Sequence, residues 1–143
     1  MKSKLLVFSQ FFLIFLMSLP FGSASNTLVF GLSILVTGGL IGLLALSKNR
    51  LGNFNIRPDI REDCTLITTG IYAYIRHPMY TSVLTMMLGV VVIYPMNYEY
   101  ILYGALVVTL LTKLFYEESL WKCESEEYIL YTHNTKRLIP FLF

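Results

Sequence analysis

The chain has 143 residues, of which 55% are hydrophobic and only 14% are charged, and its mean hydropathy is +0.62. Soluble domains carry about 25% charged residues, so the composition excludes an ordinary soluble domain and predicts an integral membrane protein. The formal net charge of +2 reflects basic residues gathered on one side of the membrane and predicts no nucleic-acid partner.

Four apolar segments predict an all-α integral membrane protein that forms a single membrane domain. A transmembrane helix needs about 20 mostly apolar residues. The four expected transmembrane helices cover residues 5–21, 27–46, 78–95 and 99–115. Only a short turn around Pro95 separates the last two, so these are expected to form a helical hairpin. Lys113 interrupts the fourth segment near its end and can extend its ammonium to the membrane interface.

The first two segments carry one further signal each. Lys2 and Lys4 precede the first apolar core and small residues at 22–25 follow it, a pattern also typical of a cleaved signal peptide. Both interpretations give the same orientation downstream, because cleavage would leave an external N-terminus before the second segment. In the second segment, Gly38 and Gly42 have the Gly-x-x-x-Gly spacing of a helix-packing motif.

The basic residues orient these segments. All eleven fall before the first segment, between the second and third, or near and after the end of the fourth: Lys2, Lys4, Lys48, Arg50, Arg57, Arg61, Arg76, Lys113, Lys122, Lys136 and Arg137. The two opposite loops contain none. Basic residues concentrate in cytosolic loops, so a multi-pass protein with both termini and both long polar stretches in the cytosol is expected.

The C-terminal polar stretch, residues 116–140, predicts a cytosolic amphipathic helix. Its apolar and aromatic residues recur at near-helical spacing: Leu120, Trp121, Tyr128 and Tyr131. Such a helix is expected to pack on the membrane surface. Pro140 would end it and return residues 141–143 to the lipid.

The two cysteines, Cys64 and Cys123, lie far apart in the sequence and match no zinc or redox spacing. Both fall on the expected cytosolic side, where thiols stay reduced. They are therefore expected to be free thiols, and no metal site is predicted.

The first polar stretch ends in the most informative motif of the chain. Arg76-His77-Pro78-x-Tyr80 places a fixed cation, an imidazole and a phenol at the start of the third span. Ionisable groups are costly beside a bilayer and are functional candidates by default. The motif therefore predicts a site at this end of the third helix.

Further motifs follow it in a fixed order. The ordered set is Thr69-Gly-x-Tyr72, Arg76-His-Pro-x-Tyr80, Glu117 with Leu120, Tyr128-x-x-Tyr131 and Arg137-x-Ile-Pro140. Over about residues 64–140 the chain resembles the isoprenylcysteine carboxyl methyltransferase family of integral membrane enzymes, which is related to phospholipid N-methyltransferases. That family has paired glutamates in register with positions 116 and 117. Here the pair is Glu117 and Glu118, so Glu117 stays in register. Ser125 and Thr135 replace the usual glycine and valine.

The resemblance implies an enzyme that uses S-adenosyl-L-methionine and is open to the membrane for a lipid-like substrate. It implies that two segments, residues 64–80 and 116–140, bind the cofactor. The residues it assigns to the cofactor are Cys64, Thr65, Leu66, Ile67, Tyr72, His77, Pro78, Met79, Tyr80 and Glu117. No Gly-x-Gly-x-x-Gly loop follows a strand, so such a site must be built from helix ends.

Two methyl acceptors and one non-catalytic alternative stay open. A lipid-like or prenylcysteine-like carboxylate is ionised at pH 7 and needs an orienting arginine, for which Arg137 is the candidate. A phospholipid amine must lose a proton and needs a base such as Glu118 or His77. The sequence shows no base with a dedicated partner, which favours the carboxylate. The third interpretation is a membrane scaffold with a decayed pocket.

Each candidate also has a structural interpretation. Arg76 is the third catalytic candidate, but an arginine at a membrane interface often only fixes topology. His77 precedes a proline and is also expected as a helix N-cap. Glu117 and Glu118 also fit the solvated start of a helix, and His133 is expected to be exposed.

Overall fold

The computed structural model describes residues 2–19, 22–49 and 66–143, and within them every regular element is a helix. Cys64 and Thr65, two of the expected cofactor residues, lie outside this part of the chain. The elements are α1 (Lys2–Met17), α2 (Leu28–Lys48), a 3₁₀ turn η1 (Gly70–Ala73), α3 (Pro78–Ile93), α4 (Asn97–Glu124) and α5 (Glu126–Asn134). The expected all-α fold is therefore confirmed.

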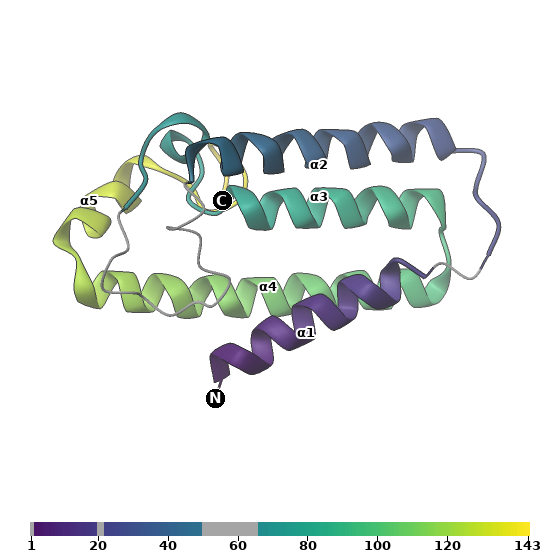
Figure 1. Cartoon of the computed structure of the whole chain (residues 1–143), viewed down its shortest axis with the longest axis horizontal. Helices are drawn as coiled ribbons and strands as arrows, with labels where there is room; N and C mark the ends of the chain where they lie inside the picture. The colour runs from purple at the N-terminus through teal and green to yellow at the C-terminus, as the bar shows by residue number, and fades with distance from the viewer. Residues whose placement is uncertain (1, 20–21, 50–65) are drawn as a thin grey trace.

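The helices form a layered bundle with the polar segments at one end (Figure 1). Helices α2 and α3 run side by side, α4 lies along α3, and α1 crosses α4 obliquely. Helix α5, η1 and the C-terminal residues all gather where α2 ends and α3 begins. This end of the bundle thus collects both motif-bearing segments of the chain.

Two helices are long and apolar enough to cross a membrane, namely Leu28–Lys48 and Asn97–Cys123. The other two, α1 and α3, have 16 residues each, fewer than the about 20 that a span normally needs. By length and composition the described chain therefore contains two candidate membrane-spanning helices, where the sequence predicted four.

Small residues bring α2 and α3 into close contact. A Cβ atom added to Gly38 would lie 2.7 Å from the backbone nitrogen of Met86, and one added to Gly42 would lie 2.6 Å from the hydroxyl of Ser82. That hydroxyl donates a 2.7 Å hydrogen bond to the Gly38 carbonyl. The prediction that Gly38 and Gly42 serve helix packing is confirmed, since only glycine allows this approach.

Helix α1 packs on α4 through both apolar and polar contacts. Met17 is buried with Leu106 and Leu110 in the bundle core. Lys113 is also buried: its ammonium donates a 2.8 Å hydrogen bond to Gln10 Oε1 and lies 5.1 Å from the centre of the Tyr80 ring. The expectation that Lys113 extends to the interface is therefore wrong, because partners inside the bundle hold its charge.

The C-terminal stretch forms two helical pieces. Helix α4 continues through residues 116–124, and Ser125 separates it from α5 by adopting an extended backbone. The Ser125 hydroxyl caps α5 by accepting a 3.2 Å hydrogen bond from the Tyr128 amide. Tyr128 and Tyr131 are buried against the bundle, so the tyrosine face that was expected on the membrane surface packs inward.

Candidate active site

Two segments far apart in sequence lie side by side at the polar end of the bundle. Ile75 and Lys136 form a parallel β-bridge. The Arg76 amide donates to the Lys136 carbonyl at 2.7 Å, and the His77 amide donates to the Arg137 carbonyl at 3.0 Å. This backbone pairing brings the arginines of two separate motifs to one place.

Helix α4 supplies the carboxylate that joins these arginines. Glu118 Oε1 accepts a 2.9 Å hydrogen bond from Arg76 Nε, and Glu118 Oε2 accepts a 3.0 Å bond from Arg137 Nε. Arg76 also donates to the carbonyls of Thr132 and Thr135. The side chains of Glu118 and Arg76 are only 3% and 6% exposed. Buried charges are tolerated when paired and hydrogen-bonded, and these contacts tie α3, α4 and the C-terminal segment together.

These contacts bear on the two structural interpretations. The Arg76 side chain is 6% exposed and is bonded within the protein, which a role as topology anchor alone does not explain. Glu118 has both oxygens bonded to arginines, and it is neither a solvated helix start nor a carboxylate free to accept a proton. The proposed catalytic roles of Arg76 and Glu118 stay predictions, and their contacts suit the positioning of other groups.

A second group, beside Glu118, is more accessible. Tyr80 Oη donates a 2.7 Å hydrogen bond to Glu117 Oε2. The His77 ring stacks on Tyr80 with centroids 5.3 Å apart, and its Nδ1 lies 3.9 Å from the same Glu117 oxygen. The Glu117 side chain is 26% exposed. This group therefore presents a carboxylate that a ligand can reach, with a phenol and a buried imidazole packed behind it.

Two buried polar atoms in this region have no hydrogen-bond partner in the described part of the chain. His77 Nε2 lies 3.5 Å from Glu118 Oε1 without forming a hydrogen bond, and Tyr128 Oη is unpartnered. Burial raises the pKa of Tyr128, with the nearby Glu118 charge acting in the same direction. Unpartnered buried groups are rare in native proteins because each costs roughly 1–3 kcal/mol. Both atoms therefore mark a place where a bound molecule can form hydrogen bonds.

Most of the residues that the sequence singled out meet here. His77 holds the N-cap position of α3, but its side chain makes no capping hydrogen bond. Pro78 and Met79 form the first turn of α3. The Tyr131 hydroxyl donates to the Tyr72 carbonyl and fixes η1 beside the site. Leu66 and Ile67 precede η1 without regular structure, and His133 is exposed as expected.

Sequence reasoning missed Tyr128 as a site residue, because its helical spacing suggested a membrane-facing surface. It also missed Gln10 and Lys113, which approach the site from the bundle interior. Among the described residues, no group of three or more His, Cys, Asp or Glu could hold a metal ion.

One comparison with known proteins bears on this arrangement. A family model described as phospholipid methyltransferase matches residues 26–122, more than half of the chain. The match includes α2, α3, the Arg76-His77-Pro78-x-Tyr80 motif and both glutamates of α4. No curated protein matches the chain.

Proposed function

Since the chain belongs to the phospholipid methyltransferase family, we propose that it moves a methyl group from S-adenosylmethionine to the amine of a membrane phospholipid. Membership of the family makes the chain a methyltransferase that acts on lipids at a membrane. The proposal adds the cofactor, the accepting atom, the residues that act and the orientation in the membrane.

We propose that all four long helices cross the membrane with the site on the cytosolic face. Sixteen residues rise about 24 Å, less than the about 30 Å hydrocarbon core. Local thinning of the bilayer and flanking residues can accommodate α1 and α3. The basic residues Lys48, Arg76 and Lys122 share the end of the bundle where the motifs meet, which supports a cytosolic site.

The residues around Glu117 fit the cofactor, which supplies an electrophilic methyl group on a sulfonium. Glu117 can accept hydrogen bonds from its hydroxyls or ammonium. Tyr128 Oη lacks a partner in the described part of the chain and can bond a polar edge of the cofactor. The His77 ring, which stacks on Tyr80, would line the cofactor. Leu66, Ile67 and Met79 would contribute apolar surface. This set supports the cofactor segments that the sequence predicted, and Cys64 and Thr65 remain candidates there.

The observation that carries the amine acceptor is the state of His77. An ammonium must lose its proton before the nitrogen can attack a methyl group. Glu118 is engaged by two arginines, whereas His77 Nε2 is unbonded and Nδ1 faces Glu117. Proton uptake at Nε2 would form an imidazolium between Glu118, which lies 3.5 Å from Nε2, and Glu117, which lies 3.9 Å from Nδ1. His77 therefore provides the partnered base that the sequence did not reveal.

A carboxylate acceptor is the second candidate, and Arg137 favours it. Arg137 Nε donates a hydrogen bond to Glu118. The guanidinium lies 5.3 Å from the ring centres of Phe115 and Phe143. Its terminal nitrogens can hold a carboxylate bidentately. Arg137→Lys would keep the charge and lose this geometry, so a lipid- or prenylcysteine-like carboxylate substrate would react severalfold more slowly.

The test is methyl transfer by the purified protein in lipid nanodiscs with methyl-labelled S-adenosylmethionine. Label in the headgroup of phosphatidylethanolamine supports the proposal. Label only in a prenylcysteine analogue supports the carboxylate acceptor. Absence of cofactor binding by calorimetry would leave the scaffold interpretation. His77→Ala should abolish transfer to the amine, and His133→Ala, which alters an exposed histidine of α5, is the matched control.

A further inference from the structure

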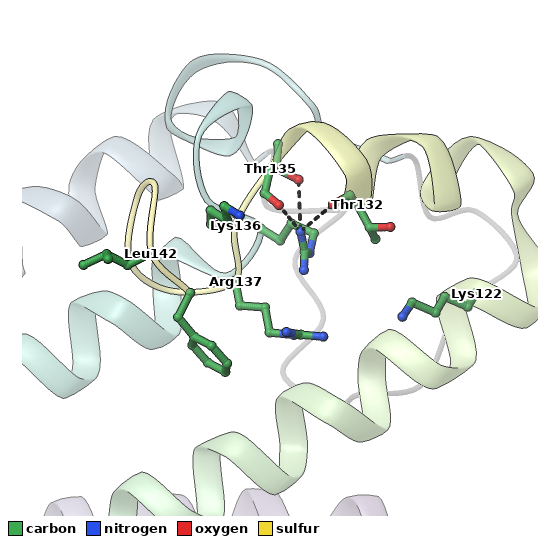
Figure 2. A pocket seen from close by; sticks show the side chains of 8 residues that line it. Lys122, Thr132, Thr135, Lys136, Arg137 and Leu142 are labelled. Atoms are coloured by element: carbon green, nitrogen blue, oxygen red, sulfur yellow. Dashed lines mark hydrogen bonds between the residues drawn. The ribbon is translucent and has the colours of Figure 1, made fainter.

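A basic pocket opens beside the Glu118 cluster, between α4, α5 and the C-terminal segment (Figure 2). Its cavity volume is about 250 Å³. The lining residues are Arg76, Lys122, Thr132, Thr135, Lys136, Arg137, Leu142 and Phe143. In Figure 2 the side chains of Lys122 and Arg137 point toward one another across the pocket. Four cations from three parts of the fold thus converge on one space.

The described residues neutralise the charges of this pocket only in part. Arg76 and Arg137 share the single carboxylate of Glu118. Lys122 and Lys136 are exposed, and neither forms an ion pair with any residue that the structure describes. Among the described residues the pocket therefore has an excess of positive charge, and an open concave site of this kind attracts anions. Arg137 belongs to both the pocket and the Glu118 cluster, so an anion bound here would lie next to the candidate active site.

The apolar rim of the pocket indicates which kind of anion it accepts. Leu142 lines the pocket and is 79% exposed, and the neighbouring Phe141 is also exposed. The amides of Leu138 and Ile139 donate to the main-chain oxygen of Phe143 and close this segment into a tight turn. Apolar side chains are thereby held beside the lysines. A free phosphate would gain nothing from them, whereas a phospholipid carries its phosphate where acyl chains meet water.

We propose that the pocket binds the phosphate of a membrane phospholipid. The proposal rests on the proposed function in one respect: there, the bound lipid is the methyl acceptor. Lys122, Lys136 and Arg137 would hold the phosphate, and the short ethanolamine linker would extend the amine toward His77. The cations would then hold the lipid by its phosphate, while His77 acts at its nitrogen.

Binding is tested first, without turnover, by calorimetry on the detergent-solubilised full chain. The probes are a short-chain phosphatidic acid, the matching diacylglycerol and inorganic phosphate. We expect the phosphatidic acid to bind, and the diacylglycerol and inorganic phosphate not to bind. In the double variant Lys122→Gln/Lys136→Gln, its affinity should fall about tenfold or more. Lys4→Gln removes an exposed charge in α1 and should change nothing.

Three outcomes would overturn the proposal. Inorganic phosphate bound as tightly as the lipid would make the pocket a free-phosphate site. Unchanged lipid affinity in the double variant would remove the lysines from the site. An equal loss of S-adenosylmethionine affinity would assign the pocket to the cofactor. Because both lysines are exposed, the double variant should keep the wild-type unfolding temperature.

Turnover then separates this proposal from the proposed function. With phosphatidylethanolamine in mixed micelles, the double variant should raise KM for the lipid and leave kcat near wild type. An unchanged KM would contradict the pocket while the methyltransferase proposal stands. Lysine-dependent lipid binding without methylation of any phospholipid would contradict the amine acceptor while the pocket stands.

Discussion

Lys113 Nζ donates a 2.8 Å hydrogen bond to Gln10 Oε1, with both side chains buried between α1 and α4. The same ammonium lies over the ring of Tyr80, whose hydroxyl donates to Glu117. A continuous set of contacts therefore runs from the first helix of the chain to the candidate active site.

Gln10→Ala should destabilise the protein and slow methyl transfer. The substitution leaves a buried ammonium without its acceptor, at a cost of about 1–3 kcal/mol or more, and frees the group that supports Tyr80. The unfolding temperature in detergent and the rate of methyl transfer should both be lower than in the wild type. Gln10→Glu supplies a stronger acceptor and should keep the wild-type unfolding temperature and rate. Ser9→Ala, at the neighbouring position, is the control. A wild-type rate in Gln10→Ala would show that α1 does not position the site.

The adjacent glutamates should separate stability from binding. Glu118→Gln removes the carboxylate shared by two arginines and leaves the buried Arg76 without its counter-charge, which typically costs about 3–5 kcal/mol. Glu117→Gln should leave the unfolding temperature near wild type and weaken S-adenosylmethionine binding roughly 10- to 150-fold, the effect of one charged hydrogen bond. Glu127→Gln, exposed on α5, is the control. The prediction would be wrong if Glu117→Gln lowered the unfolding temperature and Glu118→Gln weakened only cofactor binding.

Neighbouring glycines of α2 provide a matched pair for helix packing. Gly38→Ala places a Cβ 2.7 Å from the Met86 backbone, so the protein should lose about 1–3 kcal/mol of stability through overpacking. Gly39 has nothing within 4 Å of the corresponding position, and Gly39→Ala should be neutral or stabilising because alanine favours helix. Equal unfolding temperatures for the two variants would show that α2 and α3 are not in close contact.

The orientation in the membrane is tested by reporter fusions. Fusions at Asn49 and at the C-terminus should report a cytosolic location, and a fusion at Asn97 the opposite side. The reason is that Lys48, Arg76 and Lys136 share one end of the bundle. An external C-terminal reporter would contradict a cytosolic site, whatever the number of spans.

The sequence predicted the helices well because apolar runs are local signals. The starts of α2 and α3 were placed within a residue of the observed ones. A helix was also expected over residues 116–140. It was not foreseen that residues 116–124 continue α4 without a break, because the change from apolar to charged residues was taken as the end of the span. In the folded chain those charges are satisfied by partners inside the protein.

The site was predicted in composition but not in arrangement. The motifs predicted His77, Tyr80 and Glu117 as site residues, but not the contacts between them. Nothing local in the sequence shows that Arg76 and Arg137 share Glu118, since their proximity depends on the backbone pairing of Ile75 with Lys136. Likewise, Lys113 seemed free to reach the interface because its partner, Gln10, lies in another helix.

The pairing of Ile75 with Lys136 also makes the site depend on a segment that the rest of the bundle does not need. The contacts of α1 with α4 and of α2 with α3 lie outside residues 126–143. Without those residues, Glu118 would keep only one arginine, and Arg76 would lose the Thr132 and Thr135 carbonyls. A proteolytic cut between α4 and α5 would therefore leave a packed bundle without an assembled site, and activity would be lost before the fold.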